Sequence, residues 1–168
     1  MQRRSLLKLS LVSGVVLALA GGAAVLLQPG LEQGRLSASA RELFTSLGRA
    51  ILQGTLPADA QARSRALAGM VDRMDALVAN LPPTVQAELS QLVGLLCTVP
   101  GRLGLAGLVP AWADASEAQV QAALEGMRFS SLTLRQQAYL ALHEMVGGAY
   151  FSDESTWASV GYPGPFFL

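Results

Sequence analysis

The residues of this sequence that could carry acid–base or nucleophilic chemistry are few and stand apart from one another. His143 is the only histidine and Cys97 the only cysteine among 168 residues. With Glu144 beside it, His143 could serve as a general base, and a Cys97 thiolate could act as a nucleophile or a metal ligand. Tyr139 and Gly147, however, occupy the positions one helical turn on either side of His143, where a second ligand would have to lie. We therefore expect no catalytic residue, cofactor site or metal site in this chain.

The other candidate groups fit structural roles. Cys97 ends an uncharged apolar run, which favours a small buried side chain over a reactive thiol, and a single cysteine forms no intrachain disulfide. Asp72 and Asp75 lie three residues apart on a predicted helix, but Arg73 stands between them and Arg65 is near enough to pair with them. A charged, solvated helix face is the expected outcome.

Charge divides the chain near residue 40. The first 40 residues carry four basic groups and one acid, whereas the remaining 128 carry eight arginines and 11 acids. The net charge of zero is thus an average over a basic leader and a mildly acidic body. An acidic body without a run of Lys or Arg lacks the electrostatic footprint of nucleic-acid binding, so we expect no nucleic-acid partner. Its length fits one domain of ordinary size.

The N-terminus carries the pattern of a twin-arginine export signal: a pair of arginines, a free position, two apolar residues and a lysine. The matching residues are Arg3, Arg4, Leu6, Leu7 and Lys8. An uncharged stretch from Leu9 to Leu27 follows directly. The predicted destination is the periplasm, and the twin-arginine translocase is a predicted partner.

Two other interpretations of the leader stay open. As a helix, the 19 residues from Leu9 to Leu27 would span about 28 Å, close to the roughly 30 Å core of a bilayer. An uncleaved N-terminal helix could therefore anchor the protein to the inner membrane, and a general secretory signal is the other alternative. Ala38-Ser39-Ala40 is a candidate peptidase site. Residues 1–40 are assigned to the signal or anchor with its linker, residues 41–150 to a helical domain and residues 151–168 to a tail.

Helical periodicity dominates the body, and no strand pattern is convincing. The predicted helices are one capped by Ser39 with Glu42 and closed by Gly54, one from Pro57 to Asn80, one from Pro82 to about Thr98, one capped by Ser116 with Gln119, and one from Ser131 to Tyr150. The glycine-rich segment from Arg102 to Pro110 is expected to be a loop or a poorly formed helical turn, and Trp112 to cover the core. The fold class is all-α: a small bundle of about five helices, preceded by a signal helix and followed by an extended, aromatic, Pro/Gly-rich C-terminal tail.

The tail concentrates aromatic residues in a segment unsuited to regular structure. Six of the chain's ten aromatic residues lie between Tyr150 and Leu168, and two prolines and two glycines fall within residues 161–165. Such a segment is expected either to fold back over its own helices or to dock on a partner protein, where aromatic side chains act as anchors. The candidate partner-binding residues are Tyr150, Phe151, Trp157, Gly161, Tyr162, Pro163, Gly164 and Pro165.

The combination of a twin-arginine leader, a small helical body and this tail resembles the gluconate 2-dehydrogenase subunit 3 family. The specific part is the run from Tyr150-Phe151-Ser152-Asp153 through Trp157 to Gly161-Tyr162-Pro163-Gly164-Pro165, whereas the upstream helices match only in type and order. Members of this family are the small subunits of membrane-associated, FAD-dependent dehydrogenase complexes that oxidise sugars and alcohols.

The resemblance implies a non-catalytic accessory subunit. Such a chain would bind a folded FAD-dependent large subunit of the glucose-methanol-choline (GMC) oxidoreductase type, support its maturation and carry it across the inner membrane. FAD would belong to the partner, and electrons would pass to a separate haem c subunit or another acceptor. The alternative is a free-standing periplasmic or membrane-anchored helical binding module with the tail against its own body. A hydrolase using His143 and Glu144 is the third interpretation.

Overall fold

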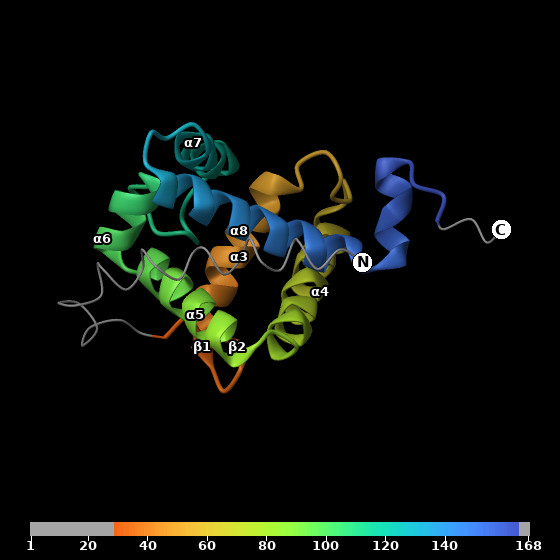
Figure 1. Cartoon of the computed structure of the whole chain (residues 1–168). Helices are drawn as coiled ribbons and strands as arrows, with labels where there is room; N and C mark the ends of the chain where they lie inside the picture. The colour runs from red at the N-terminus through yellow and green to blue at the C-terminus, as the bar shows by residue number, and fades with distance from the viewer. Residues whose placement is uncertain (1–28, 165–168) are drawn as a thin grey trace.

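The computed structural model describes residues 29–164, so the export-signal residues Arg3, Arg4, Leu6, Leu7 and Lys8 and the tail residue Pro165 lie outside the described residues. The described part is mostly helical (Figure 1). Its elements are β1 (Leu31–Glu32), β2 (Arg35–Leu36), α3 (Ala38–Ile51), α4 (Ala60–Ala79), α5 (Pro83–Cys97), α6 (Val99–Gly101), the π-helix η2 (Arg102–Ala106), α7 (Glu117–Arg128), α8 (Thr133–Phe151) and the 3₁₀ helix η3 (Glu154–Val160). The all-α prediction is confirmed for these residues.

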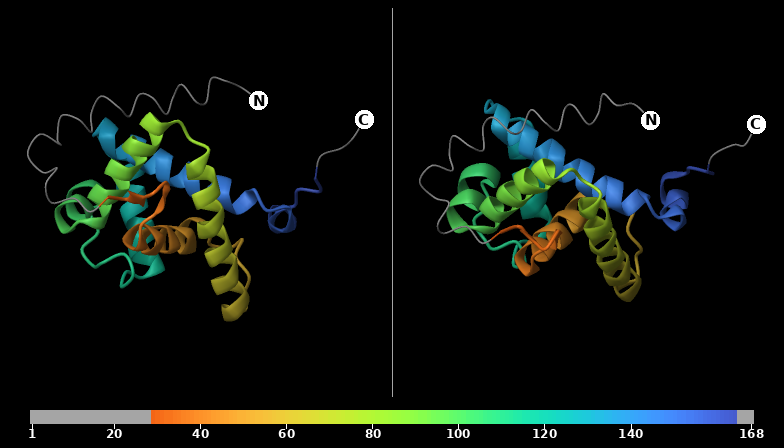
Figure 2. Two further views of the ribbon diagram at one scale, coloured as in Figure 1. Left: turned by 90° about the horizontal axis from the view of Figure 1, so that it is seen from below. Right: turned by 60° about the horizontal axis from the view of Figure 1, so that its bottom comes forward.

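The core forms where α8 crosses the bundle. Helix α8 packs on α3, α4 and α7, and Figure 2 shows it running the length of the molecule. The apolar positions of each helix recur every three or four residues, so each helix turns one stripe inward. The largest fully buried side chains are Leu43, Phe44, Leu47, Met70, Met74, Val78, Val93, Leu96, Val120, Met127, Leu142 and Val146. They come from all five long helices, and the five periodic segments of the sequence thus build one core.

A short β-hairpin precedes the first helix, where the sequence predicted a linker. Strands β1 and β2 are antiparallel, and Gln33 and Gly34 turn between them with φ of 51° and 77°. The hairpin is docked by backbone contacts: Gly30 N donates to the Ser90 carbonyl of α5 at 3.1 Å. A Cβ on Gly30 would lie 2.7 Å from that carbonyl, so only glycine allows this close approach. Residues 30–36 therefore belong to the folded body.

The hairpin moves the start of α3. The N-cap is Ser37, whose extended backbone follows β2 and whose Oγ accepts from Ala40 N at 3.3 Å. The predicted cap at Ser39 is wrong, because Ser39 already lies within the first turn of α3. Ala40 is completely buried.

Helices α5 and α6 are joined by a tight bend rather than by a loop. Thr98 is extended and caps α6 by accepting from Gly101 N at 3.1 Å. A Cβ on Gly101 would lie 1.9 Å from the Leu95 carbonyl, so the bend requires glycine. The segment beginning at Arg102 is a π-helix ended by Gly107 in the left-handed conformation, rather than a loop.

The start of α7 and the position of Trp112 agree with the sequence prediction. Ser116 and Gln119 form a reciprocal capping box at the start of α7. Trp112 is 5% exposed, and its Nε1 donates to the Leu96 carbonyl at 2.8 Å, so it covers the core as expected.

The acidic pair on α4 has a different partner from the predicted one. Arg41 of α3 donates to Asp72, and its Nη1 lies 2.8 Å from Asp75 Oδ2. The hydrogen bond that Arg41 donates to Asp72 is the largest cause of the raised pKa of Arg41. Arg65 makes neither contact, because Arg41 reaches across from the neighbouring helix. Asp75 also accepts from Leu36 N at 2.9 Å, so this carboxylate joins α3, α4 and the hairpin.

Candidate partner-binding site

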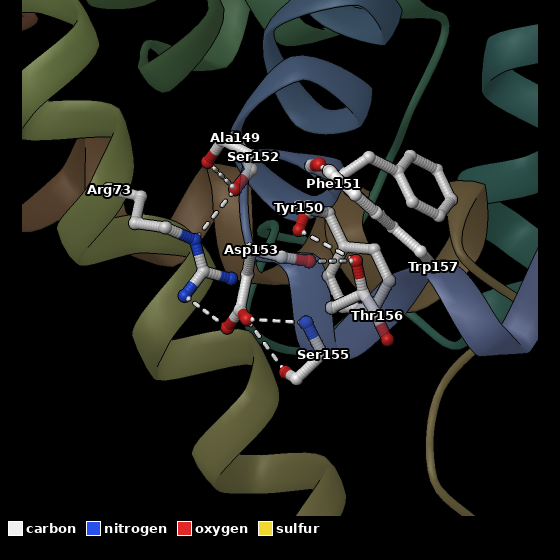
Figure 3. A network of polar contacts seen from close by, with 9 residues as sticks. All are labelled: Arg73, Ala149, Tyr150, Phe151, Ser152, Asp153, Ser155, Thr156 and Trp157. Carbon is white, nitrogen blue, oxygen red and sulfur yellow. Dashed lines mark hydrogen bonds and ion pairs between the residues drawn. The ribbon is translucent and has the colours of Figure 1, made fainter. Parts of the chain in front are cut away.

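The predicted partner-binding residues that the structure describes gather at one end of the molecule, where the C-terminus of α8 meets α4 and η3 (Figure 3). A cleft of about 400 Å³ opens there. Its lining residues are Thr55, Pro57, Arg65, Ala66, Gly69, Arg73, Tyr150, Asp153, Ser155, Thr156 and Ser159.

Arg73 fixes this junction from α4. Its Nε donates to the Ala149 carbonyl at 2.8 Å, and its Nη1 lies 3.1 Å from Asp153 Oδ2. Ala149 is one of the last carbonyls of α8, where a cation is also favoured by the helix dipole. One half-buried guanidinium therefore holds both the end of α8 and the residue that begins η3, as Figure 3 shows.

Asp153 is the N-cap of η3. Its Oδ1 accepts from Ser155 N at 3.0 Å and from Ser155 Oγ at 2.7 Å. These bonds to Ser155 are the largest causes of its lowered pKa, and Arg73 adds a smaller electrostatic effect in the same direction. Asp153 is therefore held as a carboxylate that contacts both Ser155 of η3 and Arg73 of α4.

The tail is not extended over residues 154–160, which form η3, and this corrects the prediction for that part of the segment. Thr156 Oγ1 donates to the Asp153 carbonyl at 2.7 Å, and Trp157 Nε1 donates to the Phe151 carbonyl at 2.8 Å. Gly161 ends η3 with φ of 70°, which suits a residue without Cβ. The Pro/Gly run thus starts after a capped helical turn.

The aromatic residues of the segment fall into two groups. Tyr150 is 3% exposed and its hydroxyl donates to the Thr55 carbonyl at 3.3 Å, so its ring belongs to the core. Burial raises the pKa of Tyr150. Trp157 is half-buried, its ring centroid lies 5.2 Å from that of Tyr162 in an edge-on arrangement, and Tyr162 is 48% exposed. Phe151 is half-buried against Tyr150.

The remaining predicted residues surround this aromatic pair. Gly161 and Pro163 are exposed, and Gly164 lies beside the Trp157 ring. No residue of η3 is buried. The surface available to a partner is therefore centred on Trp157 and Tyr162, with Val160 52% exposed beside them.

Sequence reasoning missed Arg73 and Asp153 as the residues that position this surface. An Asp two residues before Ser155 was a usable capping signal, but the pairing with Arg73 has no local signature.

The candidate catalytic groups lie elsewhere and stay separate. His143 is on α8, exposed, with its ring centroid 5.6 Å from that of Tyr139. Cys97 is half-buried against the core, and burial raises the pKa of its thiol, which disfavours the reactive thiolate. Among residues 29–164 no group of three His, Cys, Asp or Glu side chains is arranged to hold a metal ion.

A larger cleft of about 590 Å³ lies between the hairpin and α4. Its two lining carboxylates, Asp72 and Asp75, are both occupied by Arg41. Of the two, Asp75 also docks the hairpin through the Leu36 amide.

Comparisons of the sequence and structure with protein-family models, curated proteins and solved structures found no match. The resemblance carried by the C-terminal segment stays a prediction.

Proposed function

We propose that this chain is a non-catalytic small subunit that binds a folded, FAD-dependent GMC-type dehydrogenase and carries it to the periplasm on its own twin-arginine signal. The observation that supports this proposal is the placement of the Trp157–Tyr162 pair. The two rings sit on a capped helical turn that is tied to the bundle through Asp153 and Arg73, yet no residue of that turn is buried.

This arrangement suits binding rather than self-packing. A capped, ion-paired segment loses less conformational freedom when a partner docks than an unstructured tail would. Trp and Tyr rings are the side chains most often found as energetic anchors in interfaces. The role in maturation and the separate haem c acceptor belong to the same proposal and follow from the family resemblance.

The decisive experiment is co-expression of this chain with a GMC-type flavoprotein that has no signal of its own. We expect the flavoprotein to co-purify and to reach the periplasm with FAD bound. Replacing the signal pair, Arg3→Lys with Arg4→Lys, should retain both proteins in the cytoplasm. If the flavoprotein still reached the periplasm, the shared-signal proposal would be wrong. Absence of co-purification would favour the free-standing binding module instead.

A further inference from the structure

A different apolar surface lies at the end of the molecule opposite η3 (Figures 1 and 2). It covers α6, η2 and the segment after them, and we call it the α6–η2 face. Its members are the exposed residues between Thr98 and Asp114, namely Val99, Pro100, Leu103, Gly104, Gly107, Val109, Ala111 and Ala113. Val99 is 58%, Leu103 45% and Val109 74% exposed. Every member is apolar, glycine or proline, which is unusual for a continuous stretch of exposed surface.

The fold removes the one charge that this stretch contains. Arg102 is the only charged residue between Glu88 and Asp114. It is 9% exposed, and its Nε and Nη2 donate to the carbonyls of Leu108 and Val109, each at 3.3 Å. The guanidinium therefore ties the turn together from inside, and the outer side presents no charge.

The surroundings of Phe129, an exposed aromatic residue elsewhere, differ from those of the α6–η2 face. Phe129, at the end of α7, is 75% exposed, but the guanidinium of Arg128 lies over its ring at 5.2 Å. This arrangement mixes charge with apolar surface, as is ordinary for a solvated protein face. At the α6–η2 face the neighbouring cation is Arg135 of α8, which is half-buried beside Gly107 and whose Nε donates to the Leu105 carbonyl at 2.7 Å.

The geometry favours a face that lies on a bilayer rather than one that crosses it. Within residues 29–164 no single helix is long and apolar enough to span a membrane; α5 with the α6–η2 segment passes that test only together, across a bend of 91°. Leu92, Val93 and Leu96 of α5 are committed to the protein core. Only the segment after the bend turns apolar side chains outward.

The chain enters the folded body close to this face. Gly30 lies against Ser90, in the middle of α5, and against Gly94, one helical turn further along α5 and five residues before α6 begins. The apolar part of the uncharged stretch that begins at Leu9 ends at Leu27, and Gly30 follows three positions later. Three residues reach at most about 11 Å. A bilayer that held the uncharged stretch would therefore lie within about 11 Å of Gly30, on the side of the body where α5 leads into the α6–η2 face.

We propose that the α6–η2 face is a membrane-contact surface that inserts Val99, Leu103 and Val109 into the interfacial region of a lipid bilayer. Contact would rest on apolar burial, since Arg102 is buried and the half-buried Arg135 beside the face donates to the Leu105 carbonyl. The proposal does not depend on the identity of the partner protein. It would orient η3 away from the bilayer, on the side where a large partner has room.

The test uses the full chain alone, reconstituted into phosphatidylcholine vesicles with and without phosphatidylglycerol. In a Cys97→Ser background, Val109→Cys is labelled with an environment-sensitive fluorophore, and Phe129→Cys is the matched exposed control. We expect a blue-shifted emission at residue 109, quenched by lipids that carry a nitroxide on the acyl chain, and neither effect at residue 129. Anionic lipid and salt should change neither result. Adding Leu103→Glu should reduce the quenching at residue 109 severalfold.

Three outcomes would overturn the proposal. The label at residue 109 could stay in water in the presence of vesicles. It could shift without lipid and with rising protein concentration, which would assign the face to a second copy of the chain. Quenching could be equal at residues 109 and 129, which would mean adsorption without a defined face. Circular dichroism checks that each variant is folded, and Ala113→Cys gives a second labelling position on the same face. Co-purification with the flavoprotein is a separate measurement, so the two proposals fail independently.

Discussion

The Nη1 atom of Arg73 lies 3.1 Å from Oδ2 of Asp153, although the two residues are 80 positions apart in the sequence. The same side chain reaches the Ala149 carbonyl, so α4 holds both the end of α8 and the start of η3. The pair of half-buried Trp157 and exposed Tyr162 therefore follows a junction that is fixed by a helix contributing no aromatic residue to it.

Replacing Arg73 should loosen this junction. Arg73→Met removes an ion pair and a hydrogen bond to a helix-end carbonyl, so we expect the free energy of unfolding to fall by about 1 kcal/mol. Amide exchange across residues 154–160 should accelerate. Arg65→Met, on the same helix and outside the ion pairs of the described residues, should change the stability by less than about 0.5 kcal/mol. Unchanged exchange in Arg73→Met would show that η3 holds its position by itself.

The stability of the junction should depend on pH through the ionisation of Asp153. Its pKa in the folded protein is lowered from 3.8, so its contribution to stability is present above the unfolded value and is lost as the pH falls through the folded pKa. The titration can be followed by the chemical shift of the Ser155 amide, which donates to this carboxylate. Because the Ser155 hydroxyl is the larger cause, Ser155→Ala should raise the midpoint more than Arg73→Gln. The reverse order would contradict the geometry.

Gly101 and Gly104 lie three residues apart in the sequence and should respond differently to the same substitution. Gly101→Ala places a methyl group 1.9 Å from the Leu95 carbonyl, which the backbone cannot avoid, and should lower the free energy of unfolding by about 2–4 kcal/mol. Gly104→Ala meets no atom within 4 Å and should be neutral or stabilising by up to about 1 kcal/mol. Urea titration compares the two, and similar losses would argue against the bend after α5.

Asp75 and Asp72 provide another matched pair. Asp75 accepts from the Leu36 amide and from Arg41, and its side chain is 19% exposed, whereas Asp72 contacts only Arg41 and is 68% exposed. Asp75→Asn should lower the free energy of unfolding by about 1–2 kcal/mol and release the hairpin to faster amide exchange. Asp72→Asn should cost less than about 0.5 kcal/mol. Equal effects would show that the hairpin does not depend on Asp75.

Trp157 should dominate binding if the proposed partner docks on this segment. Trp157→Ala should weaken the complex by about 30-fold or more, the effect expected for an interface anchor, without lowering expression. Phe129→Ala, which removes an exposed aromatic ring elsewhere, is the control and should leave binding unchanged. Titration of purified flavoprotein with each variant measures the difference. Equal affinities would remove the segment from the interface.

The sequence predicts the parts of this fold that repeat locally. Five periodic stripes predict five long helices, and the Ser116–Gln119 capping box is local enough to be recognised from spacing alone. The tail aromatics were also recognisable, since they cluster. Which of them is buried was not: Tyr150 is in the core because α8 ends against the loop containing Thr55, a contact across 95 residues.

The parts that were missed depend on contacts between distant residues. Each strand of the hairpin is two residues long, too short for an alternating pattern, and it is held by Ser90 and Asp75 from other helices. The segment after Arg102 was expected to be a loop or a poorly formed helical turn; the structure shows a π-helix, with Arg102 donating to the carbonyls of Leu108 and Val109 just beyond it. The glycines of this segment predict a break in the helix, but they do not predict the geometry that the buried Arg102 guanidinium gives to it.

The position of Ala40 bears on the order of folding and processing. A peptidase requires an accessible, extended peptide, whereas the bond after Ala40 lies in the first turn of α3 and Ala40 is completely buried. Cleavage there would remove the hairpin and the Ser37 cap together. A precursor that has already folded is therefore protected from cleavage at this bond. A chain that crosses a membrane in its folded state would keep residues 30–40 in the mature protein.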